Sequence, residues 1–183
     1  MRPYRTGRMP SRLFFLSVCH RDIPSPDAPG LTIEHWRGAV ARYLIWGRGG
    51  RSRIITHYST TPSDLWDWVT SMSDSHHPTY LYGYDLGRCL TLGQWWELMD
   101  SGRFDLTDAA GELLPNDTDD DPDHNSKRGF ICDHDPPIII NGYLDEKRIV
   151  LLDTRNYVRS PLEDIGQSLG IRRLPLPPPW ASH

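Results

Sequence analysis

The N-terminal part of the chain contains three runs of strand character. Residues 12–19 form a continuous apolar run, which is typical of a strand buried on both faces. Residues 36–46 and 51–58 are rich in aromatic and β-branched side chains and are separated by Gly-Arg-Gly-Gly at 47–50, which predicts a hairpin. Residues 20–32 hold several prolines, which cannot donate to a strand ladder, so we expect an exposed loop there.

Helical spacing first appears in the middle of the chain. Residues 63–73 follow capping residues and Pro62 and place apolar side chains on one face, which predicts an amphipathic helix. Residues 79–84 predict a short strand that stops at Asp85, and residues 90–99 predict the next helix. Asp85 therefore lies where a strand passes into a helix, and we expect it to face solvent.

The C-terminal part repeats these patterns. Residues 136–144 and 148–154 are two strand runs joined around Asp-Glu-Lys, which predicts a second hairpin. Helical spacing returns at residues 162–169, with a proline before it and a glycine after it. Residues 111–129 are poor in apolar side chains and dense in acidic ones, so we expect a disordered insertion.

Composition adds limits on size and compartment. A chain of 183 residues with net charge -4 and 38% hydrophobic residues fits one domain, which we place at residues 1–174, followed by a proline-rich tail at 175–183. It has no apolar run of membrane-spanning length, so no membrane partner is expected. Three widely spaced cysteines indicate reduced thiols and a cytoplasmic location.

Two segments resemble a known family. The first is Tyr-Leu-Tyr-Gly-Tyr-Asp-Leu-Gly-Arg-Cys-Leu at residues 80–90, and the second is residues 149–180. Both are similar to parts of the 3′-5′ proofreading exonuclease domain of family B DNA polymerases, especially the protein-primed group. That domain is RNase H-like, with acidic DEDD-type metal ligands. The resemblance implies an α/β fold with a mixed sheet of about five strands and helices packed on its faces.

The first segment keeps one acidic position of the family. There, a strand ends in a pattern like His-Asn-Leu-x-Phe-Asp, whose aspartate binds a catalytic metal ion and whose asparagine contacts single-stranded DNA. By the resemblance, Asp85 is the catalytic and metal-binding candidate. The family histidine falls on Tyr80 and the asparagine on Leu81, so the DNA-contacting neighbour is replaced.

The first strand lacks the family's paired carboxylates. These nucleases carry Asp-x-Glu there, which lets two divalent ions bind about 4 Å apart. The matching residues here are Ser17, Val18 and Cys19, and neither a hydroxyl nor a soft thiol replaces the oxygen ligands that Mg²⁺ requires. Asp22 lies shortly after and is the remaining metal candidate. The last family element, Tyr-x-x-x-Asp, would follow Trp180, beyond the end of this sequence.

The second segment supplies candidate nucleic-acid contacts. It contains Asp153-Thr154 and then a Ser-Pro-Leu helix that ends in Leu-Gly, in the order found in the family. The family does not normally use the aspartate as a metal ligand, so Asp153 is interpreted as structural or as part of the cleft wall. The candidate nucleic-acid-binding residues are Tyr84, Arg88, Arg155, Asn156 and Tyr157.

These residues lead to a leading hypothesis and two alternatives. The first is a nucleic-acid-binding, exonuclease-like domain that is catalytically degenerate or truncated, with single-stranded DNA or another nucleic acid as partner and a polymerase or replication protein as a further candidate. The second is an active Mg²⁺- or Mn²⁺-dependent 3′-5′ exonuclease that uses Asp85 with Asp22 and Asp153. The third is a protein-interaction domain that retains only the fold.

Several other patterns have simpler interpretations. Asp85 is also a candidate cap for the following helix. Cys19-His20, His76-His77 and Cys132-x-His134 lack the paired spacing of structural zinc sites, and the acidic run 117–123 lacks the glycine and glutamate of a calcium loop. Tryptophans are predicted mainly to pack in the core, although aromatic faces also stack on bases, for which Trp180 is the best exposed candidate.

Overall fold

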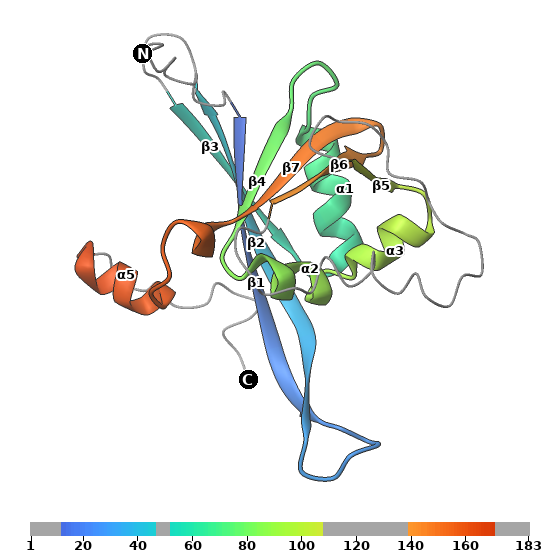
Figure 1. The fold of residues 1–183 in the computed structure, drawn as a ribbon, viewed down its shortest axis with the longest axis vertical. Helices are drawn as coiled ribbons and strands as arrows, with labels where there is room; N and C mark the ends of the chain where they lie inside the picture. Colours follow the sequence, from blue (N-terminus) through green and yellow to red (C-terminus); the bar gives the residue numbers. More distant parts are fainter. Residues whose placement is uncertain (1–11, 47–51, 108–138, 171–183) are drawn as a thin grey trace, which may run out of the picture.

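A computed structural model describes residues 12–46, 52–107 and 139–170 (Figure 1). The predicted turn at 47–50, the insertion at 111–129, the tail at 175–183 and the patterns around Cys132 and Trp180 lie outside these residues. None of the helices in the described ranges has the length and apolar character needed to cross a bilayer.

The chain folds as an α/β protein around one mixed sheet, as predicted, but the sheet has seven strands instead of about five. Their order is β3-β2-β1-β4-β7-β6-β5. β1 runs parallel to β4 and β4 parallel to β7, while the other neighbours are antiparallel. The strands are β1 (Arg12–Pro24), β2 (Thr32–Trp46), β3 (Ser52–Ser59), β4 (Thr79–Gly83), β5 (Phe104–Thr107), β6 (Ile139–Leu144) and β7 (Lys147–Asp153).

Both predicted hairpins are present, and one strand was not predicted. β2 pairs with β3, and β6 pairs with β7 through a turn in which Asp145 and Glu146 have positive φ angles of 47° and 64°. β5 has only four residues, too few for a periodic signal, and it is recognised only by its pairing with β6. The sheet therefore extends one strand beyond the elements that the sequence indicated.

Four α-helices and a short 3₁₀ helix complete the described fold. The first helix, α1 (Pro62–Met72), agrees with its prediction, and Thr61 caps it by accepting a hydrogen bond from the Asp64 amide at 3.2 Å. The others are α2 (Leu86–Leu92), α3 (Trp95–Asp100), η2 (Thr154–Asn156) and α5 (Leu162–Ser168), the last of which confirms the predicted C-terminal helix.

The single helix predicted over 90–99 is wrong, because the chain breaks between α2 and α3. Gln94 adopts a left-handed conformation with φ 53°, which no continuous helix contains. The indole Nε1 of Trp66 donates a hydrogen bond to the Gly93 carbonyl at 2.7 Å. A tertiary contact from α1 thus satisfies the carbonyl that the break leaves free.

The hydrophobic core lies on one face of the sheet. Phe14, Leu81 and Leu151 are neighbours across β1, β4 and β7, and their side chains are fully buried. They belong to one cluster with buried side chains of α1, α2 and α3, including Trp66 and Trp95. The tryptophans at these two positions pack in the core, as predicted, whereas Trp96 is exposed.

The opposite face is less covered than the sequence suggested. Phe15 points away from Phe14 and is 43% exposed, so the prediction that both faces of this strand are buried holds at Leu13 but is wrong from Phe15 onward. Strand pairing places Phe15 beside Tyr82 of β4, and their rings stack at 5.8 Å. The error arose because an apolar run does not show whether a second layer of helices covers the sheet.

The predicted exposed loop at 20–32 is present only at residues 25–31, and the residues before it belong to a strand. β1 continues to Pro24 and β2 begins at Thr32, with a bulge between Cys19 and His20. Pro24 is the last residue of its strand, a position where a missing amide proton costs little. Beyond Leu16, β1 is no longer paired with β4, and beyond Val18 only β1 and β2 remain paired, as a two-stranded arm that extends past the rest of the sheet (Figure 1).

Candidate functional site

The two segments that carry the family resemblance lie side by side. Gly83 at the end of β4 is opposite Asp153 at the end of β7, because these strands are parallel neighbours. The Thr154 hydroxyl donates to the Gly83 carbonyl at 3.2 Å, and the Tyr84 hydroxyl donates to the Ser160 carbonyl at 3.1 Å. The carboxyl ends of parallel strands are where α/β proteins commonly bind ligands.

Asp153 holds this junction together. It is 2% exposed, and its two carboxyl oxygens accept hydrogen bonds from different backbone amides: Oδ2 from Leu86 at 3.0 Å and Oδ1 from Arg155 at 2.8 Å. The first amide begins α2 and the second belongs to η2. Asp153 therefore has the structural role that was one of its two interpretations.

Asp85 does not cap the helix that follows it. Its backbone is left-handed with φ 56°, a conformation that aspartate tolerates, and its side chain makes no capping hydrogen bond. Its carboxylate Oδ1 instead lies 3.4 Å from Nη1 of Arg155, and the side chain is 33% exposed. The capping interpretation is thus wrong, since Asp153 supplies the acceptor at the start of α2.

Arg88 extends from α2 to the β1–β2 arm. Its Nε donates to Oε2 of Glu34 at 2.7 Å, and its Nη2 contacts Oε1 of the same carboxylate and Nε2 of His20, the latter at 2.8 Å. This bidentate hydrogen bond lowers the pKa of the Glu34 carboxyl and raises the pKa of the Arg88 guanidinium. The Arg88 side chain therefore links α2 to the β1–β2 arm.

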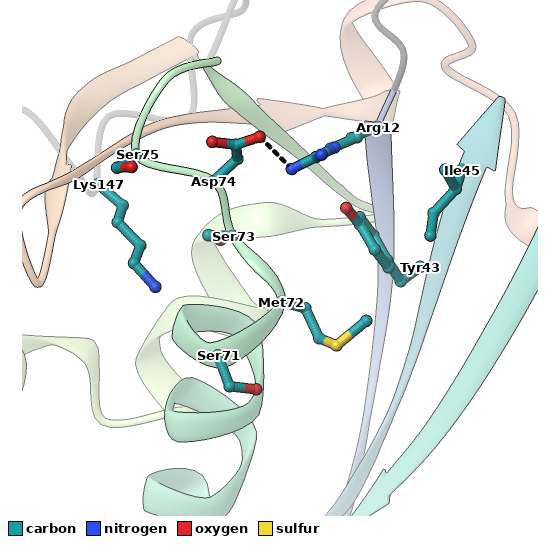
Figure 2. Close-up of a pocket in the computed structure, with 9 residues that line it drawn as sticks. All are labelled: Arg12, Tyr43, Ile45, Ser71, Met72, Ser73, Asp74, Ser75 and Lys147. Atoms are coloured by element: carbon teal, nitrogen blue, oxygen red, sulfur yellow. Dashed lines mark ion pairs between the residues drawn. The ribbon is translucent and has the colours of Figure 1, made fainter. Parts of the chain in front are cut away.

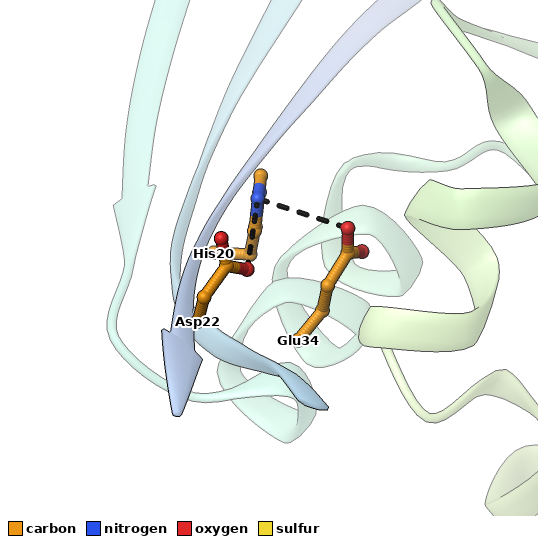
Figure 3. A group of neighbouring side chains, drawn as sticks. All are labelled: His20, Asp22 and Glu34. Atoms are coloured by element: carbon orange, nitrogen blue, oxygen red, sulfur yellow. Dashed lines mark ion pairs between the residues drawn. The ribbon is translucent and has the colours of Figure 1, made fainter. Parts of the chain in front are cut away.

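Asp22 lies on this arm and not in a loop. His20 Nε2 is 3.7 Å from Asp22 Oδ1 and 3.9 Å from Glu34 Oε1, and Figure 3 shows the three side chains converging. Donor atoms of all three lie within 4.8 Å of one another. Within residues 12–46, 52–107 and 139–170, no such group of three potential ligands includes Asp85.

The predicted metal site that combined Asp22 with Asp85 is thus not seen among these contacts, in which Asp22 lies with His20 and Glu34. Glu34 was not among the residues that the sequence indicated, and His20 was a candidate only together with Cys19. The alternating pattern His20-x-Asp22 is a usable signal, because strand residues two apart share a face. The sequence could not indicate Glu34, because only the register of the two strands places it opposite Asp22.

The 3₁₀ helix after β7 presents the candidate nucleic-acid contacts. Arg155 is 51% exposed at its side chain, and Tyr157 is 68% exposed, a high value for a large aromatic residue. Asn156 lies between them and is partly buried. An exposed guanidinium thus stands next to the Asp85 carboxylate, and an exposed aromatic ring follows two residues later in the chain.

Beneath the junction, the thiol of Cys89 is inert. It is 6% exposed, and burial raises its pKa to about 12, which keeps the thiol protonated. Its Sγ donates a weak hydrogen bond to the Tyr84 carbonyl at 3.4 Å. Cys89 therefore packs against the candidate site without offering a nucleophile.

A shallow pocket of about 460 Å³ lies elsewhere, between α1 and the sheet (Figure 2). Its charged groups already have partners: Arg12 Nη1 lies 2.5 Å from Asp74 Oδ2, and Lys147 Nζ donates to the Thr70 carbonyl at 2.7 Å. Because these contacts are internal, the pocket offers no uncommitted charge for a ligand. It is lined by Arg12, Tyr43, Ile45, Ser71, Met72, Ser73, Asp74, Ser75 and Lys147.

Comparison with known proteins yields one structural likeness. No protein-family model matches the sequence, and no curated protein matches it. Among solved structures, the fold is similar to part of the Phi29 DNA polymerase complexed with primer-template DNA and incoming nucleotide substrates, with a TM-score of 0.44 and 10% sequence identity. The match covers 96% of this chain and 26% of that polymerase, so the chain spans about a quarter of its length.

Proposed function

We propose that this chain is a nucleic-acid-binding domain related to the RNase H-like proofreading exonucleases of DNA polymerases, and that it is catalytically degenerate. Single-stranded DNA is the proposed partner. The observation that carries the proposal is that Asp85 stands at the end of β4, where those enzymes bind metal, but is paired with Arg155 instead of with other carboxylates.

The charge balance around Asp85 argues against two-metal hydrolysis. That mechanism requires several carboxylates around two cations about 4 Å apart. Here Ser17, Val18 and Cys19 occupy the matching part of β1, and the nearby Asp153 uses both carboxyl oxygens for backbone amides. Asp85 is paired with the Arg155 guanidinium, which favours a non-catalytic domain.

The residues after β7 have the chemistry of a single-strand contact. Proteins that bind single strands without sequence preference combine cationic groups for the phosphates with aromatic faces for the bases. Arg155 and Tyr157 provide both within three residues, and Asn156 adds an amide. Tyr84 and Arg88 are less available, because they are bonded to Ser160 and to Glu34.

Fluorescence anisotropy with a labelled single-stranded oligonucleotide tests the binding. We expect affinity to fall as salt rises from about 50 to about 200 mM. Tyr157→Ala should weaken binding by about 1 to 3 kcal/mol, the value typical of one stacked base. Arg155→Ala should reduce the slope of log affinity against log salt by about one.

Arg53→Ala is the matched control, because Arg53 is exposed on β3 and its loss changes the net charge equally. If Arg53→Ala and Arg155→Ala have equal effects, binding reflects overall charge and not this site. Absence of binding at low salt rules out the proposed partner.

A second assay separates the degenerate domain from an active exonuclease. The chain is incubated with 3′-labelled single-stranded DNA and Mg²⁺ or Mn²⁺, beside its Asp85→Asn variant. We expect no metal-dependent shortening from either protein. Digestion by the wild type that disappears in Asp85→Asn would establish the active exonuclease and refute the degenerate state.

One observation favours the third hypothesis, a protein-interaction domain. The sheet face opposite the helices exposes large apolar side chains, with Ile54 at 61% and Tyr58 at 48%. Strand pairing places them on the same face as Phe15 and Ile139. Large apolar side chains exposed on one sheet face can mark a protein contact. A chain that binds no nucleic acid but self-associates or captures a replication protein through this face would support that function.

A further inference from the structure

Two carboxylates face each other near the end of the β1–β2 arm. Asp22 and Glu34 are directly opposite each other in the antiparallel pair, so their side chains share one face of the ribbon. Like charges at opposed positions destabilise a strand pair. The arm has no third strand at this point, and the cation that offsets the repulsion comes from α2, as the Arg88 guanidinium bonded to Glu34.

A histidine completes the group from the same face. His20 is two residues before Asp22 on β1, and its Nε2 lies 3.7 Å from Asp22 Oδ1 and 3.9 Å from Glu34 Oε1. Donors bound to one zinc ion at 2.0 to 2.2 Å in tetrahedral array lie about 3.4 Å apart. Small rotations of three partly exposed side chains would therefore close the group around an ion (Figure 3).

We propose that His20, Asp22 and Glu34 form a binding site for one divalent transition-metal ion of the zinc class, which enters by displacing the Arg88 guanidinium. One imidazole nitrogen and two carboxylates suit zinc, whereas Mg²⁺ prefers oxygen ligands alone. Three protein ligands leave a fourth position for water. This site does not include Asp85, and the proposal is independent of nucleic-acid binding.

Arg88 marks the position of the cation. It belongs to α2, 54 residues after Glu34, and its guanidinium lies against both Glu34 and His20. A positive group brought from a separate element thus already lies among the donors that the ion would use. Metal and Arg88 compete for the same atoms, so removing the guanidinium should strengthen metal binding. If the group is only a salt bridge, neither the wild type nor a variant without Arg88 binds zinc.

Zinc binding to the full, metal-free chain is measured by competition with a chromophoric chelator, with MgCl₂ titrated in parallel. We expect one zinc ion per chain and no response to magnesium. His20→Gln, Asp22→Asn and Glu34→Gln should each weaken zinc affinity at least about 10-fold, since even indirect partners of a metal ligand cost that much. Arg88→Gln should strengthen it by up to about fivefold, the equivalent of a surface ion pair.

The matched control is His77→Gln, which removes an exposed histidine whose Nδ1 lies 3.3 Å from Asp74 Oδ2 and should leave zinc affinity unchanged. Cobalt substitution adds a spectroscopic test, because a site without cysteine gives no thiolate charge-transfer band. The proposal is overturned if neither wild type nor Arg88→Gln binds zinc, if the three ligand variants retain wild-type affinity, or if the cobalt spectrum shows thiolate. Circular dichroism confirms that each variant folds.

Discussion

The helix-covered face of the sheet and the junction at the ends of β4 and β7 are held together by different forces. On the covered face, Phe14, Leu81 and Leu151 are fully buried and contribute by leaving water. At the junction, Asp153 accepts hydrogen bonds from two backbone amides, and Asp85 forms an ion pair with Arg155. The stability of the covered face depends on its buried apolar area, whereas that of the junction depends on individual hydrogen bonds and ion pairs.

This difference determines how each region tolerates change. A core side chain has many equivalent contacts, so its loss costs energy in proportion to the cavity it leaves. A polar junction loses energy only where a buried donor or acceptor is left without a partner. Asp153 is buried and Asp85 is partly exposed, so the same chemical substitution should have unequal effects at these positions.

The largest expected effect is in the core. Leu81→Ala should lower the free energy of unfolding by about 2 to 5 kcal/mol, because Leu81 is 1% exposed in the middle of the sheet. Phe15→Ala, on the opposite face, should cost only about 1 kcal/mol, because that ring is nearly half exposed. Urea unfolding measures both. Equal losses of unfolding free energy in Leu81→Ala and Phe15→Ala would show that the two faces of the sheet are equally buried.

The junction should respond at an intermediate level. Asp153→Asn replaces one accepting oxygen by an amide that cannot accept, which leaves either the Leu86 or the Arg155 backbone amide without its partner. We expect a loss of about 1 to 3 kcal/mol in unfolding free energy. Asp85→Asn keeps the left-handed backbone and breaks one exposed ion pair, so it should cost at most about 1 kcal/mol. The reverse order would assign the structural role to Asp85.

The smallest expected effect is on the arm and depends on pH. The pKa of Glu34 is lowered in the folded chain, mainly by its hydrogen bond from Arg88. Its contribution is therefore complete above the unfolded pKa of glutamate and is lost as pH falls through the lower folded value. Glu34→Gln should cost at most about 1 kcal/mol at neutral pH, a value discounted for exposure. The difference from wild type should vanish in acid and shrink in high salt, as urea unfolding across that pH range would show.

Much of the local structure followed from the sequence. Residues 63–73, the two hairpins and the helix at 162–169 each carry their own periodicity or turn residues, so short-range physics is sufficient to predict them. The position of Asp85 at the end of a strand followed from the same patterns. These features depend on neighbours along the chain, which the sequence displays directly.

The remaining features depend on partners that are distant in sequence. Where the helix breaks before Gln94, the Trp66 indole donates a hydrogen bond to the Gly93 carbonyl. The extension of β1 through His20 and Asp22 depends on its pairing with β2. The prolines at 26 and 29 lie in the loop that they indicated, but Pro24 ends a strand, because the sequence shows which residues disfavour a strand and not which strand will pair with it. Local preference was overridden by cross-strand bonds.

The sequence by itself determined the order of most elements, the apolar face of the first helix and the lack of carboxylates at residues 17–19. Only the tertiary structure decided that Asp153 supports α2, that Asp85 faces Arg155, and that Glu34 joins His20 and Asp22. Periodicity reports whether a side chain is inside or outside. It carries no information on register or on which charges meet, because those are set when strands and helices far apart in the chain pack together.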